Sequence, residues 1–327
     1  MKEESNTKHL EFSNNLLLSQ LIGPDDENIK KIENRFGVTI AVRGNHLMID
    51  GTEPDINHAK NTLDYLYSKL NKGQDIDSED IEDAIRFSDT AINLKASDAN
   101  VANGKISVAT KRRVIFPRSP NQAEYLSAIQ NKDMVFGIGP AGTGKTYLAV
   151  AVGVSLLTAG KVNKIILTRP AVEAGEKLGF LPGDMREKVD PYLRPLYDAM
   201  HDMLPADQVE RRLNNGEIEI APLAFMRGRT LSDAFVILDE AQNTTPVQMK
   251  MFLTRLGHNA RMVITGDLSQ IDLPPGVESG LHQAISILKD IPEIDIITFN
   301  ENDVVRHPIV AKIVQAYDKK SKSTYAR

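Results

Sequence analysis

The chain contains no cysteine, and no apolar run in its 327 residues is long enough to cross a membrane. The absence of cysteine excludes disulfides and thiolate zinc sites. The longest apolar stretch, residues 147–159, is interrupted by Gly153 and Ser155 and falls short of the about 20 residues that a span needs, so it predicts a buried helix. The first 15 residues are polar and lack the apolar core of a signal peptide. We therefore expect a cytoplasmic protein.

The chain also lacks an overall positive charge, since its net charge is −5. Nucleic-acid binding must then depend on local patches. Two basic runs stand out, one from Lys111 to Arg118 and one from Lys319 to Arg327. For each run, a solvated linker or tail is as good an explanation as contact with phosphate.

The length predicts two domains, and the apolar pattern changes along the chain. Residues 1–95 predict a small α+β domain, with helices at 28–36 and 56–70 and strands at 38–42 and 46–49. Residues 96–116 have little periodicity and are expected to be a linker. Residues 117–327 alternate strand-like apolar runs with helices, which predicts an α/β domain with a mainly parallel sheet. The strand-like runs are 134–138, 164–168, 218–222, 234–238, 261–265 and 294–299.

A phosphate-loop motif, GPAGTGKT, directly follows the first of these runs and precedes a helical stretch. Its glycines let backbone N–H groups curl around phosphate oxygens at the positive end of a helix. Lys145 is expected to reach the β and γ phosphates, and the Thr146 hydroxyl to ligate Mg²⁺. The motif thus predicts binding of ATP with Mg²⁺ in a P-loop NTPase (RecA-like) fold. Its expected nucleotide contacts are Gly139, Pro140, Ala141, Gly142, Thr143, Gly144, Lys145, Thr146 and Tyr147.

Two acids, Asp239 and Glu240, end another apolar run. Asp239 is expected to hold Mg²⁺ beside the phosphate loop, and Glu240 to act as the general base for an attacking water. Gln270 follows the next run at the same sheet edge and is expected to contact the γ-phosphate or its water. A pair of helix-capping acids and a solvated glutamine are the structural alternatives.

These motifs together resemble the PhoH family of ATPases. The resemblance rests on GPAGTGKT, ILTRP, GEKLGFLPGD, FMRGRTL, LDEAQN, TGDLSQIDLP and DVVRHP, which occur in the family's order from about residue 117 onward. It implies an ATPase that handles RNA, with RNA helicase activity and a role in ribosomal RNA maturation beside a YbeY-type endoribonuclease.

The same region is similar to the first motor domain of superfamily-one helicases. That similarity assigns adenine contact to Gln122 and single-stranded nucleic-acid contact to Thr168 and Arg169. Such helicases close a second motor domain over the nucleotide, and about 50 residues after position 274 are too few for one. We therefore expect a homo-oligomeric ring in which a neighbour completes the site. Arg306, Arg227 and Arg229 are the candidate arginines, with a structural salt bridge as the alternative for each.

Residues 21–70 resemble a KH-type RNA-binding fold. A KH fold clamps nucleotide backbone with a GxxG loop between two helices. The corresponding loop here is Gly23-Pro-Asp-Asp26, whose acids repel phosphate. Protein docking or ring assembly is therefore as good an interpretation of this module as RNA contact.

Three functions follow as hypotheses. The first is a Mg²⁺-dependent ATPase coupled to RNA handling. The second is an ATP-gated binding or assembly switch without unwinding. The third is a small-molecule phosphotransferase, against which the carboxylate of Glu240 argues.

Overall fold

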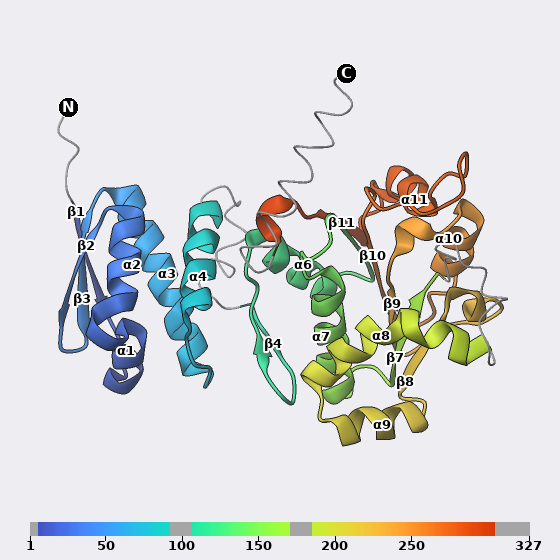
Figure 1. Cartoon of the computed structure of the whole chain (residues 1–327), viewed down its shortest axis with the longest axis horizontal. Helices are drawn as coiled ribbons and strands as arrows, with labels where there is room; N and C mark the ends of the chain where they lie inside the picture. Colours follow the sequence, from blue (N-terminus) through green and yellow to red (C-terminus); the bar gives the residue numbers. More distant parts are fainter. Residues whose placement is uncertain (1–5, 92–105, 171–184, 305–327) are drawn as a thin grey trace.

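The computed structural model describes residues 6–91, 106–170 and 185–304. Two units lie side by side, with a short β-hairpin between them (Figure 1). Within the described ranges, no helix is long and apolar enough to cross a membrane.

The N-terminal unit is a three-stranded antiparallel sheet with helices on one face. Its strands follow the order β1-β3-β2. The inward side chains of the central strand β3, among them Leu47 and Ile49, are fully buried. The bounds are β1 (Asn6–Glu11), α1 (Asn15–Ile22), the 3₁₀ turn η1 (Pro24–Asp26), α2 (Glu27–Phe36), β2 (Thr39–Arg43), β3 (His46–Gly51), α3 (Glu53–Asn71) and α4 (Ser78–Ala91).

The predicted strands and helices of this unit are present, and the structure adds β1, α1 and α4. Strand β1 has a polar sequence and forms because it pairs with β3 along its whole length. Helix α4 begins in a stretch that is mainly acidic, but Ile81, Ala84 and Ile85 follow helical spacing and are buried. The order of elements, β-α-α-β-β-α-α, places Gly23 to Asp26 between α1 and α2. The likeness to a KH fold stays a prediction.

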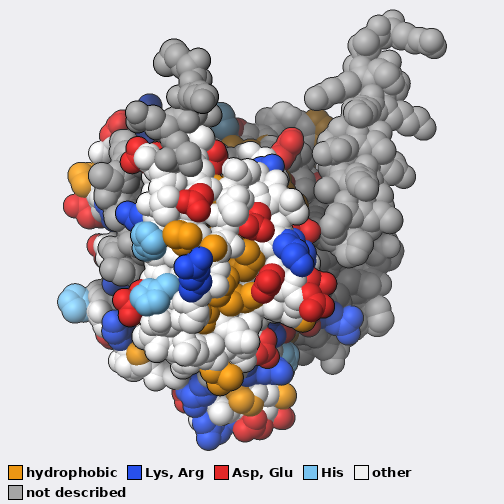
Figure 2. All heavy atoms as spheres, turned by 90° about the vertical axis from the view of Figure 1, so that its left-hand side faces the viewer, with side chains coloured by type: hydrophobic (Ala, Val, Ile, Leu, Met, Phe, Trp, Pro, Cys, Tyr) orange, Lys and Arg blue, Asp and Glu red, His pale blue; other side chains and the backbone are white. Residues whose placement is uncertain are grey.

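The outer face of the sheet is exposed (Figure 2). Apolar side chains gather at its centre, and Lys, Arg, Asp, Glu and His side chains surround them. Charges of both signs are therefore mixed on this face, and no single basic surface covers it.

The C-terminal unit, called here the ATPase unit, contains a parallel six-stranded sheet in the order β11-β6-β10-β9-β7-β8. All six predicted strands are in it, so the predicted α/β fold is confirmed. Their bounds are β6 (Met134–Ile138), β7 (Lys164–Arg169), β8 (Ile218–Pro222), β9 (Ala234–Leu238), β10 (Arg261–Gly266) and β11 (Ile294–Thr298).

Helices cover both faces of this sheet and form two apolar cores. One core joins α6, α7, α8 and α9 to the sheet, and the other joins α10 and α11. The bounds are α6 (Pro120–Asn131), α7 (Lys145–Thr158), α8 (Met185–Met203), α9 (Ala206–Asn214), α10 (Pro246–Leu253) and α11 (Gly280–Leu288), with 3₁₀ turns η4 (Leu223–Met226), η5 (Ala241–Asn243) and η6 (Glu301–Asp303).

Residues 106–118, called here the bridging hairpin, carry strands β4 (Val108–Ala109) and β5 (Val114–Ile115). Most of them belong to the expected linker, whose residues 96–105 lie outside the described ranges. Val108 and Ile115 are buried in the core of the ATPase unit, whereas Phe116 is buried in the core of the N-terminal unit. The described part of the linker is thus packed rather than solvated, because apolar residues on both sides of its basic run 111–113 are buried.

Candidate nucleotide-binding site

The phosphate loop connects β6 to α7, as its motif predicts. Gly139 has a φ of 148°, and a Cβ atom there would lie 2.5 Å from the carbonyl oxygen of Phe299. Only glycine therefore fits at this position. Gly144 precedes the first turn of α7, so the loop meets the positive end of the helix dipole.

Lys145 is the buried cation of the loop. Its Nζ donates to the carbonyl oxygens of Gly139 at 2.6 Å and Pro140 at 2.7 Å. The ammonium is thereby held at the rim of a cavity of about 250 Å³, which Thr146, Asp239 and Glu240 also line. This cavity has the mixed cationic and anionic lining that a magnesium-bound phosphate needs.

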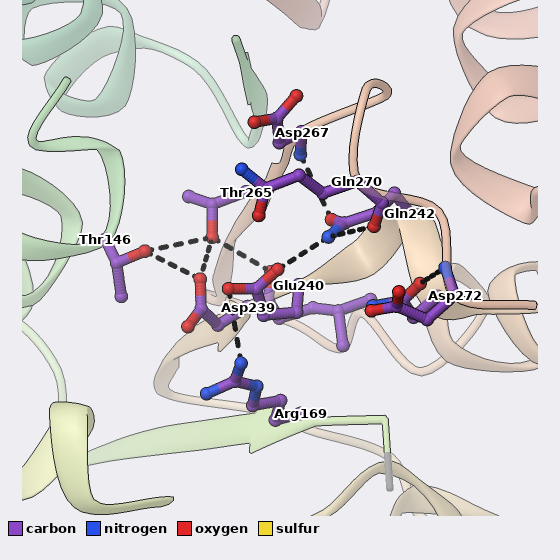
Figure 3. Close-up of polar contacts among 11 residues, drawn as sticks. Thr146, Arg169, Asp239, Glu240, Gln242, Thr265, Asp267, Gln270 and Asp272 are labelled. Atoms are coloured by element: carbon purple, nitrogen blue, oxygen red, sulfur yellow. Dashed lines mark hydrogen bonds and ion pairs between the residues drawn. The ribbon is translucent and has the colours of Figure 1, made fainter. Parts of the chain in front are cut away.

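Two threonines converge on one oxygen of Asp239 (Figure 3). Thr146 Oγ1 donates to Asp239 Oδ1 at 2.6 Å, and Thr265 Oγ1 donates to the same atom at 2.7 Å. The phosphate loop and the end of β9 are therefore joined directly. Thr265 was not among the predicted site residues, although its place at the end of a parallel strand next to β9 was a usable signal.

Glu240 lies beside Asp239 and has a left-handed backbone conformation, with a φ of 52°. Its carboxylate pairs with Arg169 Nη2 at 3.2 Å and accepts from Gln242 Nε2 at 2.6 Å (Figure 3). Arg169, which the sequence predicts to contact nucleic acid, thus forms an ion pair with Glu240, the predicted general base. This pairing joins the ends of two neighbouring strands.

Gln242 forms hydrogen bonds that connect Glu240 to the loop after β10. Its Nε2 also donates to the carbonyl oxygen of Gln270 at 3.2 Å, and its Oε1 accepts from Asp267 N at 3.0 Å. The side chain of Gln270 is exposed at the edge of the phosphate cavity. Gln242 is part of the LDEAQN motif. The motif alone does not predict that Gln242 orients the carboxylate of Glu240.

The residues at the cavity fit Mg²⁺. Hard divalent cations take oxygen ligands, and Mg²⁺ keeps several waters while binding through one or two carboxylates and substrate phosphates. Thr146 and Asp239 offer a hydroxyl and a carboxylate, and Asp267 Oδ2 lies buried without a hydrogen-bond partner among the described residues. No group of three or more metal-ligating side chains occurs in the described part of the chain. The donor set therefore fits a magnesium ion that is held partly by the phosphates of a nucleotide.

Gln122 is buried and bonded to protein on both sides of its amide. Its Oε1 accepts from Arg118 N at 2.7 Å, and its Nε2 donates to the carbonyl oxygen of Thr143 at 3.1 Å. One lone pair and one N–H of the amide remain for a ligand. Gln122 also lines a second cavity beside the loop, and its contact with adenine stays a prediction.

The candidate arginines fall into different places. Arg229 makes a bidentate salt bridge to Glu219, with distances of 2.6 and 2.7 Å, which is the structural alternative considered for it. This hydrogen bonding raises the pKa of Arg229. Arg227 is exposed after η4, and Arg306 lies outside the described residues. An arginine acting between subunits stays a prediction.

Comparisons with known proteins identify the family of this chain. A family model described as "PhoH-like protein" matches residues 114–318. A "PhoH-like protein" of Bacillus subtilis (strain 168) is 51% identical over 320 residues, covering 96% of this chain and 100% of that protein. A protein of the same description from Mycobacterium bovis is 48% identical over 302 residues, covering 92% and 85%.

One solved structure matches part of this chain, "Sulfolobus solfataricus SWI2/SNF2 ATPase core in complex with dsDNA". The match covers 61% of this chain and 47% of the chain in that structure. Its sequence identity is 13% and its TM-score 0.34, values too low to support a conclusion about function. The family model and the relatives do show the family, because they cover most of the chain. The chain therefore belongs to the PhoH family, and its site is that of a nucleotide-binding ATPase.

Proposed function

We propose that this chain hydrolyses ATP with Mg²⁺ and couples hydrolysis to RNA handling. The observation that carries the hydrolytic step is the arrangement of Thr146, Asp239 and Glu240 at one cavity. The Thr146 hydroxyl and the Asp239 carboxylate are suited to binding Mg²⁺. The Glu240 carboxylate lines the same cavity and is not needed to bind the metal, so it can act as the base.

Each side chain has a step in this reaction. Lys145 exchanges its carbonyl partners for oxygens of the β and γ phosphates. Thr146 and Asp239 would hold Mg²⁺, which would supply neutralisation of phosphate charge. Glu240 accepts a proton from water as the water oxygen bonds to the γ-phosphorus and the bond to the bridging oxygen breaks, releasing ADP and phosphate. Gln242 and Arg169 orient the carboxylate of Glu240.

The test of hydrolysis is Glu240→Gln in the full chain. Phosphate release should fall at least about 100-fold, which is the usual effect of a general base. The affinity for ATP should stay unchanged, because Glu240 does not hold the phosphates. Glu278→Gln, at an exposed acid before α11, is the matched control. Equal rates in the two variants would remove Glu240 from the reaction.

Coupling to RNA is supported by the family resemblance and by the order of elements in the N-terminal unit. The ATPase rate measured with and without single-stranded RNA tests it, because a coupled motor should be stimulated several-fold. Low salt gives phosphate contacts their greatest strength. A flat response under that condition contradicts the coupling.

An ATP-gated assembly switch is the second candidate, and two observations favour it. Asp25 and Asp26 are exposed in the loop that a KH fold uses to clamp phosphate. In the bridging hairpin, Arg112 donates to the carbonyl oxygen of His201 and Arg113 pairs with Asp202, so part of the first basic run is bound within the chain. Light scattering with and without ATP tests the switch, since a change in oligomeric state is its expected result.

The finer features that the sequence predicts or the resemblance implies are also proposals. They are a cytoplasmic location, RNA helicase activity in ribosomal RNA maturation, a homo-oligomeric ring and a YbeY-type endoribonuclease as partner. The domain borders at 95 and 117 belong with them.

A further inference from the structure

A second cavity, of about 450 Å³, lies beside the phosphate loop. It shares Gly142, Gly144 and Tyr147 with the cavity that faces Asp239 and Glu240. The two cavities therefore adjoin around the loop. A nucleotide whose phosphates lie in the smaller cavity has the larger one available for its base and ribose.

The far wall of the larger cavity comes from the N-terminal unit. Tyr65 and Lys69 of α3, and Gln74 after it, line this wall. Residues of the bridging hairpin, among them Arg113 and Phe116, line the space between the two units. The cavity is thus built by parts of the chain that are far apart in sequence.

Hydrogen bonds fix this wall against the bridging hairpin. Tyr65 Oη donates to the carbonyl oxygen of Pro117 at 2.9 Å, and Gln74 Nε2 donates to that of Val114. Lys72 Nζ donates to Ser107 Oγ at 2.8 Å. The buried aromatic rings of Tyr65 and Phe116 pack edge to face with centroids 6.0 Å apart. The wall therefore has a defined position relative to the hairpin.

The same wall is connected to the phosphate loop by a short series of polar contacts. Asp83 of α4 pairs with Arg118 Nε at 3.2 Å, and the backbone N–H of Arg118 donates to Gln122. Gln122 in turn donates to the carbonyl oxygen of Thr143 within the loop. A change in the position of either unit would alter this series.

The lining has the chemistry to bind a nucleoside. Amides of Gln74 and Gln122 offer donors and acceptors for the edge of a base. The ring of Tyr147 and the guanidinium of Arg113 offer planar groups for stacking. A concave site with a few convergent polar groups is the usual form of a small-molecule pocket.

We propose that the N-terminal unit completes the nucleoside subsite, so that base and ribose bind between Gln74 and the phosphate loop. This inference rests on the proposed binding of ATP at the loop. Because the ligand contacts both units, ATP also stabilises their packing against each other, since a ligand favours the arrangement to which it binds.

The experiment compares ATP with inorganic tripolyphosphate, which has the phosphates but no nucleoside. Dissociation constants of both, with Mg²⁺, are measured by calorimetry on the full chain. Gln74→Ala should weaken ATP binding about tenfold and leave tripolyphosphate binding unchanged. Gln130→Ala, at an exposed glutamine of α6, is the matched control and should change neither.

Hydrogen exchange of the unaltered protein gives a readout that needs no variant. ATP should increase protection of backbone amides in α3 and in residues 106–118, whereas tripolyphosphate should not. Equal ATP affinity in Gln74→Ala and Gln130→Ala, or no ATP-dependent protection in α3, overturns the inference and leaves ATP binding at the loop intact. Failure of the unaltered protein to bind ATP overturns both.

Discussion

At the scale of single residues, the shared oxygen of Asp239 is the most informative contact. Thr146 and Thr265 both donate to Asp239 Oδ1. If Thr146 ligates Mg²⁺ as proposed, Thr265 still holds the carboxylate of Asp239. The proposed mechanism therefore makes Thr265 a positioning residue for the metal.

We expect Thr265→Val to lower kcat/KM for ATP about tenfold and to raise the Mg²⁺ concentration needed for half-maximal rate, because partners behind a metal ligand usually contribute 10- to 100-fold. A magnesium titration of the ATPase rate measures this. Thr254→Val, at an exposed threonine after α10, is the control. An unchanged magnesium dependence in Thr265→Val would show that Asp239 is oriented without it.

The first glycine of the phosphate loop gives a stability prediction. Gly139→Ala places a methyl group 2.5 Å from Phe299 O, so the backbone must shift, and we expect a loss of about 3 kcal/mol. Gly160→Ala meets no atom within 4 Å and carries only the cost of a left-handed residue, about 1 kcal/mol. Urea unfolding of both variants measures the difference, and equal losses contradict the steric argument.

The acids and the phosphate loop were predictable because each one directly follows an apolar strand. Parallel strands end at the same edge of a sheet, so Asp239 and the loop had to meet. The Arg169–Glu240 pair and the double bonding of Gln122 were not predictable. They depend on side-chain directions and on the packing of the bridging hairpin, which no spacing in the sequence records.

At the scale of elements, the loop between α1 and α2 sets the charge of the predicted RNA clamp. Asp25 and Asp26 both have positive φ there, at 50° and 58°. Neither acid needs its carboxylate to form the turn, because glycine and asparagine adopt this conformation readily.

Asp26→Gly and Asp26→Asn should each raise the affinity for single-stranded RNA about fivefold, because a like-charge contact near 4 Å in water costs about 1 kcal/mol. Fluorescence anisotropy at low salt measures it. Asp207→Asn, an exposed acid of α9, should have no effect. If the Asp26 variants bind RNA no better than the control, the loop does not contact RNA.

The six parallel strands were predictable as apolar runs, whereas β1 and α4 were not. Strand β1 contains one apolar residue, Leu10, and is a strand because β3 supplies its partners. In α4, two acids, Asp80 and Asp83, lie on the packed side of the helix, where they pair with basic side chains, and they obscured its apolar face. In both, tertiary contact outweighs local propensity.

At the scale of the whole molecule, two buried tyrosines make the unfolding free energy depend on pH in the alkaline range. Burial raises the pKa of Tyr65 and of Tyr125 above the usual 10.0. The unfolded chain therefore loses these protons first, so their contribution is complete below pH 10 and declines as pH rises above it. Burial lowers the pKa of Lys72 from its usual 10.5. Below that pH, the contribution of Lys72 to the unfolding free energy therefore rises with pH, opposite to the contribution of the tyrosines.

We expect the unfolding free energy to fall above pH 10 by about 1.4 kcal/mol per pH unit for each tyrosine. Tyr65→Phe and Tyr125→Phe should each flatten the decline by one such contribution, as measured by urea unfolding between pH 9 and 11.5. An unchanged slope in both variants contradicts this assignment.

The bridging hairpin also determines how the chain can be divided. A fragment that starts at residue 117 lacks Val108 and Ile115 and leaves a hole beside α7, while a fragment that stops at residue 95 lacks Phe116 under α3. Neither half is therefore a self-sufficient folding unit when cut at those borders. The intact chain should therefore unfold on heating in a single cooperative transition, because the hairpin contributes buried residues to the cores of both units.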